Sequence, residues 1–320
     1  MKVFVTRKIP NRGIEMLRAA GHEVIVSSHD RVLTPEELVA GGQGADAVLA
    51  QLTDKITREV LKAWKPSVKI VANYAVGYDN IDAVAAKELG IIITNTPNVL
   101  TETVAEHTFA LMLAIAHRVV EADKFMRAGK YTSWEPELLL GTDLSHKTLG
   151  IVGLGRIGAR VAYHGAKGFD MSVIYYDIKR NEDFEKEVGA TFRATPEEVF
   201  KEADFVSIHV PLLPTTRHLV NAERLHLMKP TSYLVNTSRG PIIDERALAE
   251  ALRDKVIQGA AIDVFEHEPQ MEPTLKDLDN VIVTPHIASA TEETRQKMGE
   301  VAAKNIIAVL GNQKSLNPVT

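Results

Sequence analysis

The sequence predicts an α/β protein with two doubly wound, parallel-sheet domains. Strand-like and helix-like segments alternate along its 320 residues, and this alternation is typical of parallel sheets. One short apolar run leads directly into Gly153-Leu-Gly155-Arg-Ile-Gly158, which has the form of a strand, a tight turn and a helix. A chain of this length is also too long for one typical core, so we expect two domains.

Five strands are predicted in the first part of the chain. They are short apolar or β-branched runs at residues 2–6, 22–27, 45–50, 68–73 and 91–94. A helix over residues 12–20 ends at Gly21. Another helix begins with Thr34 as its cap and Pro35 at its first helical position. Residues 1–99 are therefore expected to form an α/β domain.

The pattern changes after Pro97. A long helix is predicted from Thr101 to about residue 126, and Gly129 ends it. Residues 131–144 are irregular and carry Trp134. This segment is either an arm that packs on a partner subunit or a loop folded over its own domain, and the sequence leaves both interpretations open.

The glycine-rich stretch predicts a dinucleotide-binding Rossmann domain. Gly153 can adopt the backbone angles of the turn, Gly155 lets the main chain approach a ligand, and Gly158 lets the helix pack closely on the strand. The helix N-terminus offers N–H groups and a partial positive charge to a pyrophosphate. The alternative is a glycine-rich turn that binds no ligand.

Asp177 argues against that alternative and indicates which dinucleotide binds. It ends a second apolar run, residues 171–176, about twenty residues after the glycines, where an acid can accept hydrogen bonds from a ribose diol. The same carboxylate would repel a 2′-phosphate, so NAD is favoured over NADP. Lys179 and Arg180 weaken this preference, because either could turn towards a phosphate.

Candidate catalytic residues follow the later strands of this domain. Strands are predicted at residues 205–210, 232–236, 259–262 and 281–284, before a closing helix at 291–309. Arg239, Glu268 and His286 come just after three of them. Ligands of doubly wound sheets bind beyond the carboxyl ends of the strands, so these side chains are expected to converge near the nicotinamide. Singly each is more often a surface or turn residue; together, beside a dinucleotide site, they favour catalysis.

These residue types suit a 2-keto acid and its alcohol. The planar fork of Arg239 can pair with a carboxylate and polarise the adjacent carbonyl. His286 titrates near neutral pH and can give a proton to the carbonyl oxygen as hydride arrives, while Glu268 holds the imidazole. Backbone N–H groups of the turn Ala75-Val-Gly77-Tyr could bind the substrate carboxylate.

Composition excludes several other classes of protein. A net charge of −5 gives no general attraction to nucleic acid or acidic membranes. With no cysteine there is no disulfide and no thiolate site, which fits a reducing compartment. The longest apolar run, residues 109–116, is too short to span a bilayer. We therefore expect a cytoplasmic protein. No metal site is expected, because Glu102, Glu106 and His107 lack the second histidine of a recognised motif.

Five motifs follow one another along the chain: Ala75-Val-Gly-Tyr-Asp-Asn-Ile-Asp82, Gly153-Leu-Gly-Arg-Ile-Gly158, Val235-Asn-Thr-Ser-Arg-Gly240, Asp263-Val-Phe-Glu-His-Glu-Pro269 and Thr284-Pro-His-Ile-Ala-Ser289. Through them the chain resembles the D-isomer-specific 2-hydroxyacid dehydrogenases over essentially its whole length, and most closely their glyoxylate and hydroxypyruvate reductases.

The resemblance implies a set of site residues. It implies catalysis by Arg239, Glu268 and His286, and binding of the substrate carboxylate by the backbone of Val76 and Gly77. Ser289 and Trp134 match positions near the substrate, with Trp134 reaching from a partner subunit. The implied cofactor residues, beyond the glycines and Asp177, are Thr103, Arg156, Ile157, Pro211, Thr237 and Asp263.

The resemblance also implies an architecture. Residues 1–99 and 287–320 would form a flavodoxin-like substrate domain, to which the last helix returns, and residues 100–286 the Rossmann domain. A homodimer would be built around the helix that begins at Thr101.

The expected function is hydride transfer between NAD(H) and a small 2-keto or D-2-hydroxy acid, with glyoxylate or hydroxypyruvate as the favoured substrate. Many reductases of this type use NADPH, and Asp177 departs from their pattern. A phosphite dehydrogenase is disfavoured, because such enzymes carry a lysine in the loop occupied here by Ala75-Val76. Another 2-hydroxyacid dehydrogenase and an NAD-binding corepressor remain alternatives, although Arg239 and His286 favour an enzyme over a corepressor.

Overall fold

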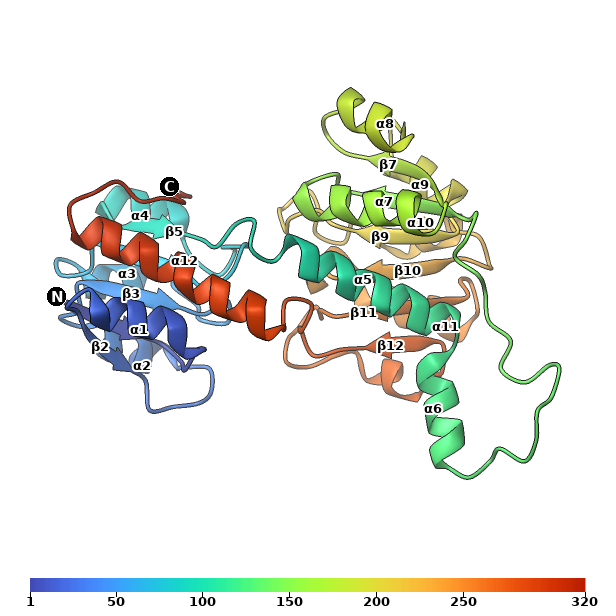
Figure 1. The fold of residues 1–320 in the computed structure, drawn as a ribbon, viewed down its shortest axis with the longest axis horizontal. Helices are drawn as coiled ribbons and strands as arrows, with labels where there is room; N and C mark the ends of the chain where they lie inside the picture. Colours follow the sequence, from blue (N-terminus) through green and yellow to red (C-terminus); the bar gives the residue numbers. More distant parts are fainter. Residues whose placement is uncertain (320) are drawn as a thin grey trace. The chain divides into compact units, whose positions relative to one another are not determined.

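The computed structural model describes residues 1–319 and divides into two compact units, each of them an α/β domain with one parallel sheet (Figure 1). Unit 1 comprises Met1–Leu100 and the chain from Ser289 onward, and unit 2 comprises Thr101–Ala288. The predicted fold class, two doubly wound parallel-sheet domains, is confirmed.

Unit 1 has a five-stranded sheet in the order β2-β1-β3-β4-β5, which is the flavodoxin-like order. The central strands β3 and β4 are buried throughout, as expected where helices cover both faces. The strands are β1 (Lys2–Val5), β2 (Glu23–Val26), β3 (Ala47–Ala50), β4 (Ile70–Asn73) and β5 (Ile92–Thr94). The helices are α1 (Asn11–Ala19), α2 (Pro35–Gly42), α3 (Arg58–Trp64), α4 (Ala83–Leu89) and α12 (Glu292–Leu310).

The last helix, α12, packs beside α1 on one face of this sheet (Figure 1). Buried Asn305 then ties the C-terminal segment to the helix, because its Oδ1 accepts hydrogen bonds from the N–H groups of Leu316 (2.9 Å) and Asn317 (3.0 Å). Beyond it, Pro318 forms an antiparallel bridge with Thr94 at the edge of the sheet. The C-terminal segment is therefore an integral part of unit 1.

Unit 2 has a seven-stranded sheet in the order β12-β11-β10-β9-β6-β7-β8. Strands β6 and β9 are neighbours at its centre, and this is the point where a Rossmann sheet reverses its winding direction and binds its ligand. The strands are β6 (Thr148–Val152), β7 (Ser172–Tyr176), β8 (Thr191–Phe192), β9 (Phe205–Ile208), β10 (Tyr233–Asn236), β11 (Gly259–Ile262) and β12 (Val281–Val283).

Helices cover both faces of this sheet. One apolar cluster joins α5 and α7 to the sheet, and a second joins α9, α10 and α11 to it. The helices are α5 (Thr101–Ala116), α6 (Val119–Arg127), α7 (Arg156–Gly168), α8 (Glu182–Val188), α9 (Pro196–Glu202), α10 (Ala222–Leu227) and α11 (Glu245–Arg253). None of the helices formed by residues 1–319 combines the length and apolarity that a bilayer-spanning segment needs.

The single long helix predicted from Thr101 to about residue 126 is wrong, because it is two helices. Arg118 adopts a left-handed conformation (φ 56°) and separates α5 from α6. Its guanidinium binds Glu121 through two hydrogen bonds of 2.8 and 2.7 Å. Helix propensity stays high across this break, but no residue of α6 is buried, so no core contact continues the direction of α5.

Candidate active site

The turn between β6 and α7 has the geometry of a dinucleotide-binding loop. Gly153 has φ 99°, and a Cβ there would lie 2.8 Å from the main chain of His209 and Val210 after β9. A Cβ on Gly158 would lie 2.0 Å from the carbonyl oxygen of Gly153. In contrast, a Cβ on Gly155 would meet open space, so a ligand can approach the main chain there.

The first turn of α7 supplies the groups that a pyrophosphate needs. Gly155 is the N-cap of α7 and provides no side-chain cap, and Arg156 and Ile157 begin the helix. Their N–H groups thus point out of an uncapped helix N-terminus, where the helix dipole favours an anion. These residues fit the phosphates of a nicotinamide dinucleotide.

Asp177 lies immediately after β7 and is joined to this turn. Its Oδ2 accepts a hydrogen bond from the N–H of Leu154 (2.7 Å), and its Oδ1 accepts one from the N–H of Lys179 (3.2 Å). A carboxylate has further lone pairs, so it can also accept from a ribose diol. Arg180 is engaged elsewhere: its guanidinium pairs with Glu185 at 2.9 and 2.7 Å.

Three further residues predicted for the cofactor lie on unit 2. Thr103 is in the first turn of α5, and Pro211 follows β9. Thr237 follows β10, and its Oγ1 lies 3.0 Å from the Oγ1 of buried Thr108. Burial lowers the pKa of His209, which follows β9, to about 3, so its imidazole is neutral and bonds Ser207 Oγ at 2.8 Å.

The three predicted catalytic residues follow β10, β11 and β12 in unit 2, and two of them are in direct contact. His286 Nδ1 lies 3.0 Å from Glu268 Oε2, while Glu268 Oε1 accepts a hydrogen bond of 3.1 Å from the N–H of Phe265. Burial disfavours the ionised Glu268, but the hydrogen bond from His286 and the charge of Arg239 outweigh it and hold the pKa of Glu268 below its ordinary value. Glu268 is therefore a carboxylate at neutral pH.

Asp263 anchors the segment that carries His286. It is fully buried at the end of β11. Its carboxylate accepts hydrogen bonds from Thr284 Oγ1 (2.6 Å), Ile287 N–H (2.8 Å) and Ala288 N–H (2.8 Å). Burial opposes its ionisation, but these hydrogen bonds and the one from His107 outweigh burial and lower the pKa of Asp263. An ionised Asp263 thus fixes the chain on the C-terminal side of His286, which itself has φ 54°.

In unit 1, the turn after β4 presents a row of backbone N–H groups. The carbonyl oxygens of Ala75, Val76 and Gly77 accept hydrogen bonds from Thr96 N–H (2.9 Å), Asn95 Nδ2 (2.8 Å) and Asn73 Nδ2 (2.8 Å). In a trans peptide the N–H points opposite to the carbonyl, so the N–H groups of residues 76–78 point away from these partners. A row of this kind can bind a carboxylate.

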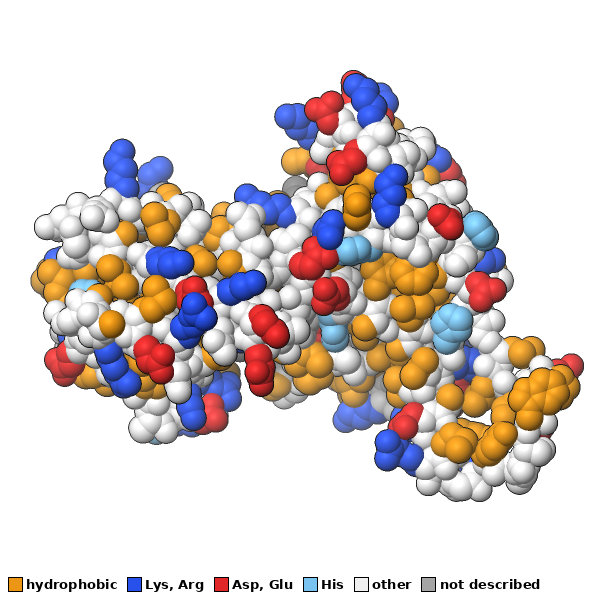
Figure 2. Space-filling view, in the orientation of Figure 1, with side chains coloured by type: hydrophobic (Ala, Val, Ile, Leu, Met, Phe, Trp, Pro, Cys, Tyr) orange, Lys and Arg blue, Asp and Glu red, His pale blue; other side chains and the backbone are white. Residues whose placement is uncertain are grey.

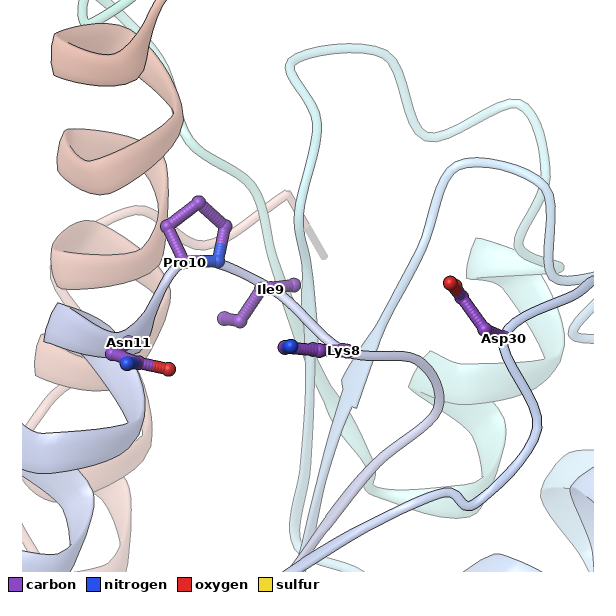
Figure 3. A pocket seen from close by; sticks show the side chains of 5 residues that line it. All are labelled: Lys8, Ile9, Pro10, Asn11 and Asp30. Atoms are coloured by element: carbon purple, nitrogen blue, oxygen red, sulfur yellow. The ribbon is translucent and has the colours of Figure 1, made fainter.

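The remaining predicted substrate residues lie apart in the sequence and differ in exposure. Ser289 is half-buried at the start of the C-terminal part of unit 1, and Trp134 is 79% exposed in the irregular segment after α6. An open depression beyond the end of β1 is lined by Lys8, Ile9, Pro10, Asn11 and Asp30 (Figure 3). None of the predicted site residues lines it.

The sequence did not indicate the asparagines whose side chains fix the backbone of the site segments. Asn73 and Asn95 fix the turn after β4, and Asn236 fixes the segment of Arg239 by accepting from Ser238 N–H (3.0 Å) and donating to Arg239 O (3.0 Å). The signal that could have found them is an asparagine at or just beyond the carboxyl end of β4, β5 and β10, where its amide can bond a neighbouring turn.

Comparison with known proteins identifies the family. The model of the D-isomer specific 2-hydroxyacid dehydrogenase, NAD binding domain, matches residues 109–288. A glyoxylate reductase of Pyrococcus furiosus is 49% identical over 311 residues, which cover 96% of this chain and 91% of that protein. The chain belongs to the D-isomer-specific 2-hydroxyacid dehydrogenases. The resemblance to this family that we inferred from five motifs is confirmed.

Solved structures agree with this membership. A protein of Thermus thermophilus has a TM-score of 0.93 at 43% identity, with 100% of both chains covered. The NADPH-dependent glyoxylate/hydroxypyruvate reductase of Sinorhizobium meliloti, solved with NADP and malonate, has a TM-score of 0.85 at 31% identity, covering 100% of this chain and 96% of that one. This dehydrogenase is thus an oxidoreductase that uses a nicotinamide dinucleotide and a small 2-hydroxy or 2-keto acid.

Proposed function

We propose that this dehydrogenase reduces glyoxylate or hydroxypyruvate with NADH. The observation that carries the proposal is the Glu268–His286 pair, in which an ionised carboxylate holds one nitrogen of an imidazole beyond the carboxyl ends of a Rossmann sheet. Unit 2 would act as the cofactor domain and unit 1 as the substrate domain.

Each side chain has one role in this proposal. The reduced nicotinamide supplies the hydride. Glu268 accepts a hydrogen bond from the protonated Nδ1 of His286, so Nε2 is the atom that gives a proton to the carbonyl oxygen. Arg239 polarises that carbonyl, and the N–H groups of Val76 and Gly77 bind the carboxylate. Ser289 and Trp134 would border the substrate.

The NADH preference rests on Asp177. Its carboxylate is next to the glycine loop, and Arg180, one of the two candidate phosphate ligands, is paired with Glu185 instead. The relative solved with NADP shows that the fold also accepts the phosphorylated cofactor, so the charge of Asp177 is the feature that would decide. Thr103, Pro211, Thr237 and Asp263 would line the rest of the cofactor site.

A homodimer is also proposed, built on α5 and the segment that follows it. Apolar side chains gather on the projecting end of unit 2 (Figure 2), and the exposed ones include Val119, Met126, Tyr131, Trp134 and Leu140. Solvent contact of so many large apolar groups is costly, and a second copy would cover them. A cytoplasmic location stays a prediction from the absence of cysteine.

The direct test is a substrate panel. Glyoxylate, hydroxypyruvate and pyruvate are each offered with NADH, and oxidation of the cofactor is followed by absorbance. We expect turnover with glyoxylate or hydroxypyruvate to exceed that with pyruvate. A preference for a bulkier keto acid would replace the proposed substrate, and no turnover with any of them would favour a binding module.

A further inference from the structure

Glu245 is a buried acid whose partners are backbone groups. It is the first residue of α11 and is only 6% exposed. Its Oε2 accepts a hydrogen bond from the N–H of Glu266 (2.8 Å), and its Oε1 accepts one from the N–H of Glu272 (2.7 Å). Hydrogen bonds to an ionised acceptor are shorter and stronger than neutral ones.

The two N–H donors flank a tight turn. Between them, Gln270 N–H donates to His267 O at 2.9 Å, and these two residues form an isolated antiparallel bridge. Glu268 lies at the tip of this turn and reaches His286 from there. The carboxylate of Glu245 therefore joins the two ends of the turn that carries Glu268.

The rest of the surroundings leaves this turn little freedom. A Cβ on Gly240 would lie 1.9 Å from the carbonyl carbon of Phe265, so the chain after Arg239 packs directly against the start of the turn. On the outer side, the Glu266 carboxylate bonds Arg217 (2.8 Å) and His218 (2.7 Å). Among the hydrogen bonds found in residues 1–319, only those of the Glu245 carboxylate join the two ends of the turn, at Glu266 and Glu272.

We infer that Glu245 is a positioning residue for the Glu268–His286 pair. It touches neither substrate nor cofactor in the proposed reaction, and it acts by fixing the turn so that Glu268 meets Nδ1 of His286. This inference rests on the proposed function for its kinetic consequences, but the geometry of the pair can be measured without turnover.

Glu245→Gln is the appropriate variant, because it keeps the size of the side chain and replaces one acceptor oxygen by an NH2 donor. That donor would then face a backbone N–H, which cannot accept it. Glu250→Gln is the matched control, since it makes the same chemical change in the same helix on an exposed residue, whose carboxylate pairs with Arg246 at 3.2 Å.

The first readout is the titration of the His286 ring, followed by NMR in histidine-labelled protein and assigned with His286→Gln. Arg239 acts on Glu268 through its charge, and the anchored Asp263 holds the segment that follows His286. In Glu245→Gln we expect the midpoint to move to lower pH, by up to about one pH unit, as in Glu268→Gln. Glu250→Gln should leave it at the parent value. An unshifted midpoint in folded Glu245→Gln would overturn the inference.

The second readout is kinetic. Misplacement of a catalytic group commonly costs about 10- to 100-fold in rate, so kcat should fall by this amount while the Kd of NADH changes less than about two-fold. When Glu245→Gln is added to Glu268→Gln, kcat should fall little further, because both substitutions disrupt the same Glu268–His286 contact. Fully additive losses would mean a structural role only. If the NMR midpoint moves but the parent reduces no keto acid, the positioning role stands and the proposed function fails.

A second pair of variants keeps the test available if Glu245→Gln does not fold. Glu272→Pro removes the N–H that Glu245 Oε1 accepts, and the φ of −53° at Glu272 suits proline. Glu272→Ala keeps that N–H and loses the same side chain. We expect the proline variant alone to shift the His286 midpoint to lower pH, and equal midpoints in the two would refute the inference.

Discussion

At the scale of single residues, we expect turnover to depend most strongly on His286. We predict that His286→Ala loses about 100- to 10,000-fold in kcat, the usual cost of removing a general acid, and keeps NADH affinity. His226→Ala, on an exposed surface of α10, is the matched control and should behave as the parent. Fluorescence titration with NADH alongside steady-state rates separates binding from turnover. Reduction of glyoxylate or hydroxypyruvate by His286→Ala at nearly the parent rate would remove His286 as the acid.

The pH dependence should follow from the same pair. Because the pKa of Glu268 is lowered, its carboxylate keeps its charge from mildly acidic to alkaline pH. Keto-acid reduction needs the protonated ring and should fall as pH rises, whereas oxidation of the hydroxy acid should rise. Glu268→Gln removes the anion that stabilises the imidazolium, so reduction should be lost at lower pH.

Asp177 should set the choice of cofactor. We predict that kcat/KM is about 10- to 100-fold higher with NADH than with NADPH, because a carboxylate near a 2′-phosphate adds like-charge repulsion. Asp177→Asn removes the charge and keeps an acceptor for the N–H of Leu154, so it should narrow this ratio. Equal or better efficiency of the parent with NADPH would refute this prediction and point to Lys179 or Arg180 as a phosphate ligand. An unchanged ratio in Asp177→Asn would mean that the charge of Asp177 does not set the choice.

Asn95 should affect substrate affinity through the turn that it holds. Asn95→Ala frees the carbonyl of Val76, and losing one hydrogen bond of about 1 kcal/mol should raise the KM of the keto acid about five-fold with kcat little changed. Asn95→Asp also loses the donor and adds a negative charge, so its KM should be higher still. An unchanged KM in both variants would mean that this turn does not bind the carboxylate.

At the scale of elements, we predict that alanine has different effects on stability at the two glycines where α1 and α12 cross. A Cβ on Gly13 would lie 2.5 Å from the carbonyl oxygen of Gly299, whereas a Cβ on Gly299 would meet Gly13 at an ordinary 3.6 Å. Gly13→Ala should therefore lower stability by about 1–3 kcal/mol. Gly299→Ala should be neutral or stabilising by up to about 1 kcal/mol, from helix propensity alone. Thermal unfolding of the two variants tests this, and equal Tm values would contradict it.

Elements were predictable where a repeating pattern marked them. Most strands of unit 1 and the longer strands of unit 2 are buried apolar runs, whereas β2 is a partly exposed β-branched run; all of these were found within a few residues of their ends. The break between α5 and α6 at Arg118 was not predicted, because it depends on where the core contacts of α5 stop. Strand β8, with two residues, is too short to show any period.

At the scale of the whole molecule, the order of strands explains which site residues the sequence could indicate. Parallel strands end at one edge of the sheet, so residues just beyond β10, β11 and β12 were expected together, and Glu268 does meet His286. Asn95 and Glu245 escaped notice, because each bonds the backbone of a segment 19 to 27 residues away and no spacing rule links them.

The last prediction concerns the assembly of the whole molecule. Helix α6 has no buried residue, and with the segment after it exposes Trp134 (79%), Leu140 (63%) and Met126 (57%), which is unfavourable for an isolated chain. We expect sedimentation to give about twice the 35.2 kDa of one chain. Trp134→Ser combined with Leu140→Glu should shift the equilibrium towards the monomer and lower turnover, because Trp134 would complete the substrate site of the partner. Val84→Ser removes a comparably exposed apolar side chain from unit 1 and should leave both properties unchanged. A parent protein that sediments as a monomer at all concentrations would overturn the dimer and, with it, the assignment of Trp134 to a partner's site.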